Sequence, residues 1–309
     1  MYTAEIVKDH PCVDEMVFYD DGERPLSLMR LVAEVRERRY DLVFHTHPSL
    51  RLALITRLAG IPVRVGTGYR WYSFLFNRKV WEHRKDARFH ELEYNLHLLG
   101  AVGCEVGEEK IYPVLSVSPE ATERSSLLLR ELGIGGNDAL VVLHPGSGRS
   151  ARDWGAANFG TLGRRLSELP DVKVLIIGGK KEQNIVSEVQ SYMKPGTATL
   201  VDRLTLRDYA ALLRQATVFV ANSTGPIHIA AAVGTAVIGL YPQLTALSAR
   251  RWGPYTVRKT IFSPADKPEN CRECFFEKGG SCSCMSSISI DGVFEAAAKY
   301  LKERSMARV

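Results

Sequence analysis

The chain has 309 residues, of which 45% are hydrophobic and 24% charged, with a formal net charge of +5. This length suggests two domains, each able to bury its own core, and the composition is that of a soluble globular protein. No apolar run approaches a membrane span and no signal peptide is visible, which argues against an integral membrane or secreted protein. The six cysteines, with Cys12 and Cys104 isolated, do not form a disulfide framework, so we expect a cytoplasmic protein.

The first half of the chain alternates short apolar runs with segments of helical periodicity. This alternation predicts a parallel sheet with helices on both faces. The expected elements, in order, are a strand at Glu15–Tyr19, a helix over 28–35, a strand at Asp41–His45, a helix at Leu50–Ala59, a strand at Ile61–Val65 and a helix over 92–99.

Residues 66–90 interrupt this rhythm with a mixture of cations and aromatic side chains. Two interpretations stay open: contact with an anionic, amphiphilic partner, or a solvated loop whose aromatic residues fill the core. Nucleic acid is not expected as a partner, because no known binding-module motif accompanies the basic residues. The residues concerned are Arg64, Arg70, Arg78, Lys79, Arg84, Lys85 and Arg88, with Tyr69, Trp71, Tyr72, Phe74, Phe76 and Trp81.

Residues 104–137 read as a connection between domains, with prolines and glycines around one charged helix at Glu120–Leu132. We therefore expect a first domain over residues 1–136 and a second over residues 137–309. The second domain has the pattern of a doubly wound α/β fold, in which ligands bind at the carboxyl ends of the strands. Its expected strands are Ala139–Leu143, Val172–Ile177, Val218–Ala221 and Ala236–Leu240.

Polar, glycine-containing loops follow three of these strands, at residues 144–149, 178–182 and 222–228. Backbone N–H groups and an arginine can hold a diphosphate, and a glutamate shortly after a glycine turn can hold ribose hydroxyls. Pro226 suits the first turn of a helix, whose free N–H groups attract anions, and His228 lies one turn further. An ordinary strand–helix–strand crossover remains the alternative for the last loop, but three such loops together predict a nucleotide site.

Four cysteines lie close together near the end of the chain. The first pair has zinc-knuckle spacing, whereas the second pair is separated by a single residue. A structural zinc site is therefore one interpretation, against reduced thiols or a local disulfide staple. The residues are Cys271, Cys274, Cys282 and Cys284.

Taken together, these motifs resemble glycosyltransferase family nine, the heptosyltransferases, over nearly the whole chain. No single motif is decisive, but their order and spacing are similar to those of the family. The matching segments are His144-Pro145-Gly146, Asp153-Trp154 with Asn158-Phe159, Gly178-Gly179 with Glu182, and Asn222–Gly234 in the second half, and Tyr40–Val43, Ser49–Arg51, Arg57–Gly60, Arg64–Gly66 and residues 90–99 in the first.

The resemblance implies a GT-B architecture, with two Rossmann-like domains that face a cleft. It implies an enzyme that transfers heptose from ADP-heptose to the inner core of lipopolysaccharide, with inversion and without a metal or other cofactor. The chain would then be cytoplasmic, either free or peripheral at the inner face of the cytoplasmic membrane. By position, the donor site would contain His144, Gly146, Ser147, Gly148, Arg152, Glu182, Ser223, Thr224, Gly225 and His228, and the acceptor site Ser49, Arg51, Arg70 and Arg78.

The chain departs from the family pattern at its start. The family opens with a strand and a glycine-containing turn that carries an acidic residue, the general base, and nothing in this sequence matches that unit. We therefore expect an incomplete first domain and little transferase activity, since a positioned base contributes about 10²–10⁴-fold in rate. His45, His47 and His90 match no motif that would make them the base.

Either of two explanations would account for this departure: the start codon was placed too late, or the chain is a natural remnant of a longer ancestor. A non-catalytic remnant that binds nucleotide or an envelope partner is accordingly the alternative function. A nicotinamide-dependent dehydrogenase is not expected, because no strand is followed by the full G-x-G-x-x-G fingerprint.

Overall fold

The computed structural model describes residues 3–8, 10–107, 109–148, 151–265 and 282–306. The chain divides into two compact units, Met1–Lys110 and Ile111–Val309. The boundary thus lies within the predicted connection, and the part from Ile111 onward, which the sequence analysis assigns to the first domain, groups with the second unit. Its helix α5 (Pro119–Glu131) lies against α8 (Leu206–Gln215), where the Arg124 guanidinium contacts the Asp208 carboxylate at 2.7 Å.

Unit 1 contains a parallel sheet, and three of its helices begin with a side-chain cap. Ser27, Ser49 and His90 each accept a backbone N–H of the first turn that follows, which satisfies a donor the helix leaves open. The strands lie in the order β1 (Leu42–Phe44), β2 (Val63–Thr67) and β3 (Arg78–Val80). The helices are α1 (Ala4–Val7), α2 (Leu28–Glu37), α3 (Leu50–Leu58) and α4 (Glu91–Gly100), with 3₁₀ turns at Ser73–Leu75 and Arg84–Asp86.

The prediction of a strand at Glu15–Tyr19 is wrong, because this segment has no partner strand among the described residues. It instead runs as irregular chain into a turn, where the Leu26 N–H donates to the Tyr19 carbonyl at 3.0 Å. Val17 and Tyr19 pack against the small core between α2 and α3. The apolar side chains that suggested a strand are thus buried without a sheet.

A buried histidine should make the stability of unit 1 depend on pH. His45 follows β1, lies 4.8 Å from the Phe76 ring and contacts the Thr56 hydroxyl at 3.1 Å. Burial, with the charge of Arg64, lowers the pKa of His45 from 6.5 to about 4. The folded state therefore favours the neutral imidazole. The free energy of unfolding of unit 1 should keep its full value above pH 6.5 and fall by roughly 3 kcal/mol as the pH drops toward 4. In urea titrations, His45→Gln should remove most of this dependence, whereas an unchanged dependence would assign it to other groups.

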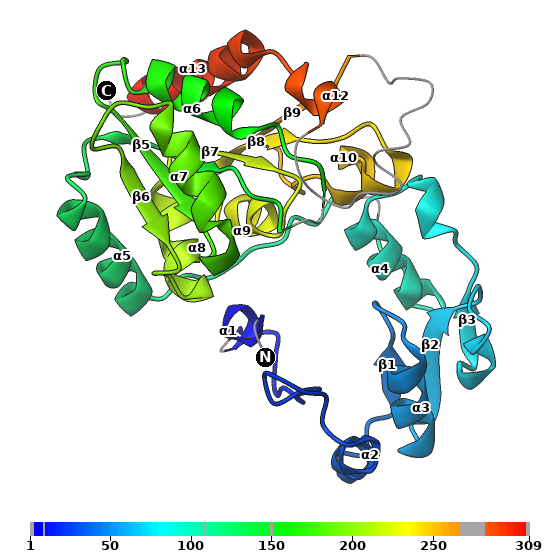
Figure 1. The fold of residues 1–309 in the computed structure, drawn as a ribbon. Coiled ribbons are helices and arrows are strands. Elements are labelled where there is room, and N and C mark those ends of the chain that lie inside the picture. Colours follow the sequence, from blue (N-terminus) through cyan, green and yellow to red (C-terminus); the bar gives the residue numbers. More distant parts are fainter. Residues whose placement is uncertain (1–2, 9, 108, 149–150, 266–281, 307–309) are drawn as a thin grey trace. The chain divides into compact units, whose positions relative to one another are not determined.

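Unit 2 is built on one six-stranded parallel sheet whose central strands are buried on both faces (Figure 1). Val141 and Leu143 of one strand enter the core beneath α6, α7 and α13, whereas Leu140 and Val142 enter the core beneath α5, α8 and α9. The strand order is β6 (Ala198–Val201), β5 (Val172–Gly178), β4 (Ala139–His144), β7 (Val218–Asn222), β8 (Ala236–Leu240) and β9 (Lys259–Phe262). The helices are α6 (Ala156–Leu166), α7 (Gln183–Ser191), α9 (Pro226–Ala232), α10 (Ala249–Trp252), α12 (Ser283–Ser286) and α13 (Ile290–Met306), besides α5 and α8.

The predicted fold class, α/β with two Rossmann-like units, is confirmed. Both sheets are parallel throughout, as expected of strands joined by helical crossovers. Among the helices that the structure describes, none has the length and apolar character needed to cross a membrane.

Candidate functional site

The strand order of unit 2 contains a reversal between β4 and β7. The chain first builds outward from β4 through β5 to β6, and then returns to place β7 on the other side of β4. In open sheets of this kind, ligands bind outside the carboxyl ends of the strands at such a switch point. The loops at 144–148, 178–182 and 222–228 follow β4, β5 and β7, which are neighbours in the sheet. The structure therefore brings the three predicted loops to one edge.

The Glu182 carboxylate joins two of these loops. It accepts the Gly179 N–H at 2.8 Å and the Gly148 N–H at 3.3 Å, and one oxygen lies 3.4 Å from Nε2 of His144. Nδ1 of His144 is in turn 3.2 Å from the Tyr209 hydroxyl. The sequence predicts Glu182 as a ribose ligand, which stays a prediction. In the structure, the Glu182 carboxylate connects the loop after β4 to the loop after β5 through these hydrogen bonds.

The environment of Glu182 favours its ionised form. Burial alone would raise the pKa of Glu182, but the hydrogen bond and charge of His144, together with the N–H groups of Gly179 and Gly148, hold that pKa below its ordinary value of 4.5. A carboxylate that is ionised and held by backbone donors is a fixed acceptor at neutral pH. This suits it to receive hydroxyl groups of a ligand.

Two glycines in the loop after β4 have structural reasons to be glycine. A Cβ on Gly146 would overlap the Glu182 carboxylate, and Gly148 has a φ of +56°, which favours a residue without a side chain. The bare backbone of this loop is thus in direct contact with the carboxylate. Such a loop leaves room for a ligand to approach main-chain N–H groups closely.

Asn222, at the end of β7, holds the loop after β4 from the other side. Its amide donates to the Pro145 carbonyl at 2.6 Å and to the Asp153 carboxylate at 3.4 Å, and its oxygen accepts the Trp154 N–H at 3.0 Å. Asn222 is completely buried. The sequence analysis places Asn222 in a turn and does not predict its role in holding the loop after β4. A polar residue at the end of an apolar strand is the signal that could have identified this role.

Ser147 and Arg152 are both buried beside this network. The Ser147 hydroxyl donates to the Ala151 carbonyl at 3.0 Å, which closes the loop on itself. Arg152 and Asp153 are buried too, a position that charged side chains rarely occupy without compensating partners. Residues 149–150, which lie between Ser147 and Arg152 in the sequence and include Arg149 of the predicted loop, are outside the described residues.

The loop after β7 leads directly into α9. Ser223 and Thr224 are half-buried, Gly225 is exposed, and Pro226 occupies the first helical turn as the sequence predicts. His228 is half-buried in the next turn. The N–H groups of Ile227 and His228 already bond to the carbonyls of Thr224 and Gly225, at 3.2 and 3.0 Å. The predicted donor residues of this loop are thus at the switch point, and Gly225 is the exposed one among them.

The four predicted acceptor residues lie in unit 1 in two different settings. Ser49 caps α3, and Arg51 donates to the Leu26 carbonyl while it lies 5.2 Å from the Tyr19 ring. These contacts give both residues a structural role. Arg70 and Arg78 are exposed near β3.

The structure confirms the core-filling interpretation of the segment 66–90 for part of its aromatic residues, and partner contact stays a prediction for the exposed ones. Tyr72 and Phe76 fill a small core with Ala53, whereas Trp71 and Phe74 are exposed to solvent.

The predicted zinc cluster falls partly outside the described residues, since Cys271 and Cys274 belong to 266–281. Cys282 and Cys284 are free thiols with their sulfur atoms 3.2 Å apart, and Cys282 is buried in the core beneath α13. Within the part of the chain that the structure describes, no three His, Cys, Asp or Glu side chains gather to hold a metal ion.

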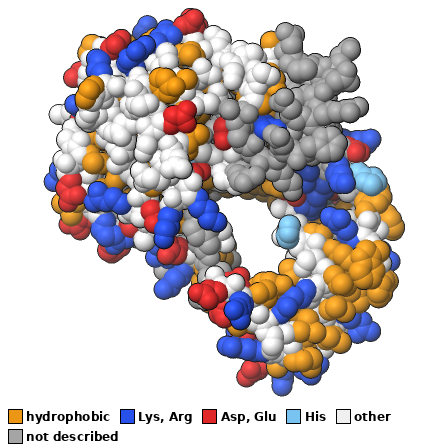
Figure 2. Space-filling model, viewed as in Figure 1, with side chains coloured by type: hydrophobic (Ala, Val, Ile, Leu, Met, Phe, Trp, Pro, Cys, Tyr) orange, Lys and Arg blue, Asp and Glu red, His pale blue; other side chains and the backbone are white. Residues whose placement is uncertain are grey.

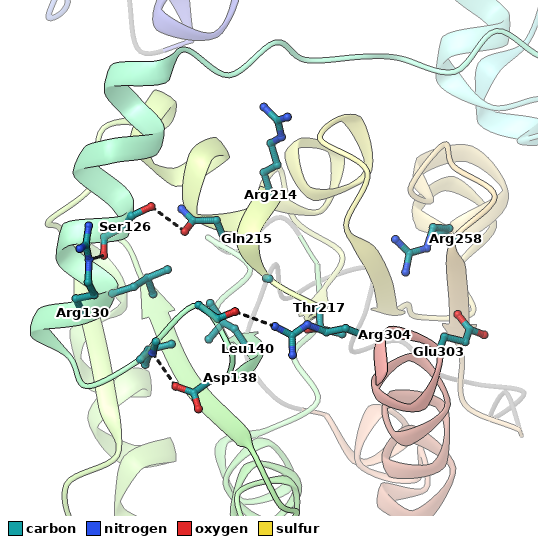
Figure 3. A pocket seen from close by; sticks show the side chains of 15 residues that line it. Ser126, Arg130, Asp138, Leu140, Arg214, Gln215, Thr217, Arg258, Glu303 and Arg304 are labelled. Atoms are coloured by element: carbon teal, nitrogen blue, oxygen red, sulfur yellow. Dashed lines mark hydrogen bonds between the residues drawn. The ribbon is translucent and has the colours of Figure 1, made fainter. Parts of the chain in front are cut away.

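A cavity of about 930 Å³ lies at the amino edge of the unit 2 sheet, opposite the edge with the switch point (Figure 3). Arg130, Arg214 and Arg304 line it, and each stands in the last turn of its helix, α5, α8 or α13. Helix C-termini carry negative partial charge, which these arginines offset. Asp138 and Glu303 also line the cavity and offset part of the positive charge, and none of the predicted site residues lines it, so the switch point remains the candidate.

The geometry defines a Rossmann-type domain with a candidate site at its switch point, and the comparisons with known proteins identify its family. The family model for glycosyltransferase family 9 (heptosyltransferase) matches residues 28–279. The chain therefore belongs to glycosyltransferase family 9.

Relatives of this family resemble the chain at modest identity. A provisionally named glycosyltransferase of Haemophilus influenzae is 27% identical, with 82% of this chain and 75% of the relative covered. Lipopolysaccharide heptosyltransferase 3 of Escherichia coli is 26% identical over 75% of this chain and 68% of its own. The solved structure of E. coli ADP-heptose lipopolysaccharide heptosyltransferase II matches with a TM-score of 0.76 at 18% identity, covering 98% of this chain and 88% of that one, which supports the fold.

Proposed function

We propose that this chain is a glycosyltransferase that transfers heptose from ADP-heptose to the inner core of lipopolysaccharide. The observation that carries the proposal is the pair of loops joined by Glu182 at the switch point of a family 9 chain. Relatives whose names specify lipopolysaccharide heptosyltransferases support the choice of donor and acceptor.

In this proposal, each part of the switch point has a role toward the donor. The loop after β4 and the N–H groups of Thr224 and Gly225 ahead of α9 hold the diphosphate, and Arg152 neutralises the charge that grows on the diphosphate as it leaves. Glu182 accepts ribose hydroxyls. The acceptor hydroxyl attacks the anomeric carbon from the opposite face, which inverts its configuration, and no metal or other cofactor takes part.

The attack also requires a base to remove the proton of the acceptor hydroxyl. His45 is buried against Phe76, and His90 accepts the Leu92 N–H as the cap of α4. Neither is placed as the base, and we assign this role to no residue of the chain.

We further propose that the protein works in the cytoplasm, at the inner face of the membrane. Cys12 and Cys104 are exposed free thiols, which suit a reducing compartment. An acceptor that is part of lipopolysaccharide is amphiphilic and anchored in a bilayer. The exposed cations and aromatic residues of unit 1 suit such an acceptor.

Two measurements on the full chain test the proposal. Calorimetry with ADP should show binding, and ADP release from ADP-heptose should depend on a lipopolysaccharide acceptor. Absence of ADP binding at millimolar concentration would remove the donor site. ADP binding without any transfer would support the alternative, a remnant that keeps the nucleotide site.

Replacing Arg152 should weaken binding of the diphosphate more than binding of the nucleoside. A charge-assisted contact to phosphate contributes about 1.5–3 kcal/mol, and adenosine lacks that partner. We expect Arg152→Ala to lose roughly 10- to 100-fold in ADP affinity with little change for adenosine, measured by calorimetry. Arg164→Ala, an exposed arginine on α6, is the control. Equal losses for ADP and adenosine would mean that Arg152 acts through folding and not on the phosphates.

A further inference from the structure

A group of rings in unit 1 is exposed and yet held in place. Trp81 follows β3 and is 63% exposed, but its ring lies flat on the backbone of Gly68, where a Cβ would come within 2.5 Å. The Tyr69 ring meets it edge-on at 5.3 Å, and the His83 ring stacks on Tyr69 at 3.7 Å. We call Tyr69, Trp81 and His83 the aromatic shelf.

The aromatic shelf forms one side of a small cavity with polar groups at its rim. The cavity has a volume of about 260 Å³, and Phe89 and Tyr94 complete its apolar lining. At the rim, the Asp86 carboxylate and the Arg88 guanidinium are exposed and 3.9 Å apart, a loose pair in which each group keeps capacity for other partners. The cavity thus combines a flat apolar surface with an acceptor and a donor.

The loop that carries these groups is anchored from below. The buried Tyr94 hydroxyl accepts the Arg88 N–H at 3.1 Å and contacts the His83 carbonyl at 3.5 Å. Glu82 bonds to the His97 ring at 2.7 Å. The backbone that carries the rings and the rim residues is therefore held in place before any ligand arrives, which lowers the entropy lost on binding.

We propose that the aromatic shelf and its rim bind a sugar ring. One face of a sugar ring presents C–H groups with slight positive charge, and these pack against the negative face of an aromatic ring. The hydroxyl groups at the edge of the sugar then reach Asp86 as acceptor and Arg88 as donor. Because the predicted donor residues lie in unit 2 and the predicted acceptor residues in unit 1, we assign this sugar to the acceptor, an assignment that rests on the proposed function.

The same surface fits a lipid bilayer less well. Figure 2 shows hydrophobic and basic side chains gathered over unit 1 near β3, as a membrane-binding surface would have. The cavity itself, however, has the Asp86 carboxylate at its rim, which repels an anionic headgroup but accepts a sugar hydroxyl. Trp71, which is 75% exposed, does not line the cavity and serves as a matched control.

The test compares Trp81→Ala with Trp71→Ala in the full chain. The probe is a lipid-free, heptose-containing inner-core oligosaccharide, followed by saturation-transfer NMR and calorimetry. Trp81→Ala should lower its affinity about tenfold and Trp71→Ala less than twofold. Equal effects of the two substitutions, or none, would overturn the proposal. Loss of binding to anionic phospholipid vesicles in both variants, with oligosaccharide binding unchanged, would identify a membrane surface instead.

A second variant keeps Trp81 but moves it. Gly68→Ala places a methyl group against the indole and should reduce oligosaccharide affinity as Trp81→Ala does. Unaltered affinity in Gly68→Ala would contradict a pre-formed shelf. ADP binding is measured in every variant, so that failure at the shelf is distinguished from failure of the donor site in unit 2.

Discussion

Asn222→Ala should destabilise unit 2 by about 4 kcal/mol and abolish nucleotide binding. The substitution leaves the Pro145 carbonyl and the Trp154 N–H buried without their partner, and each orphaned group costs about 1–3 kcal/mol, besides the cavity left by the lost side chain. The loop after β4 loses its fixed position at the same time. Urea unfolding measures the stability, and calorimetry with ADP measures the binding.

Asn222→Asp separates these contributions. The aspartate keeps an acceptor for the Trp154 N–H, but it cannot donate to the Pro145 carbonyl and adds a charge beside Asp153. It should therefore be destabilised as well, with partial recovery at acidic pH, where protonation removes the repulsion and restores a donor. A loss below 1 kcal/mol for both variants would show that the network around Asn222 contributes little.

Gly146→Ala should lower the affinity for ADP at least a hundredfold while the protein stays folded. The added methyl group would occupy the position of the Glu182 carboxylate, so that Glu182 must leave the N–H groups of Gly148 and Gly179. Both the diphosphate loop and the ribose acceptor are then displaced together. Hydrogen bonds to charged groups are worth about 1.5–3 kcal/mol each, which sets the expected size of the effect.

The control for this substitution is a glycine of unit 2 at the amino edge of the sheet. A Cβ on Gly136 meets open space, and its φ is not positive, so Gly136→Ala should bind ADP as the parent chain does. Circular dichroism and thermal unfolding verify that both variants are folded. Parent-like ADP affinity in Gly146→Ala would mean that the nucleotide does not use this loop.

The sequence was most informative where strands are buried on both faces. β4, β5, β7 and β8 are mostly apolar because helices cover both sides of the sheet, with Lys173 of β5 as an exposed exception, and all four were predicted. β6 and β9 lie at the sheet edges, and β3, with the sequence Arg-Lys-Val, is largely exposed, so none of the three has that pattern. Strand formation there depends on a neighbouring strand, which a single-sequence pattern does not reveal.

The candidate site shows the same division between local and distant information. The three loops were predicted because glycine and polar residues follow apolar strands, a local signal. The contacts that shape them are distant in sequence: His144 meets Tyr209 and Asn222 meets Trp154 across 65 and 68 residues. Trp81 was noted as one aromatic residue among many, and its stacking on Gly68 depends on the turn between β2 and β3.

The indole of Trp154 has a consequence for the order of events during synthesis of the chain. Its Nε1 donates to the Ile288 carbonyl, 134 residues further along the chain, at 3.0 Å, and α13 then covers α6. At about 5–20 residues per second, the ribosome needs roughly 7–27 s to supply that partner. During this interval the loop after β4 has left the ribosome without the residues that close over Trp154. We therefore expect nascent chains to bind ADP only after the segment around Ile288 has been made, and the unfinished edge stays open to chaperones until then.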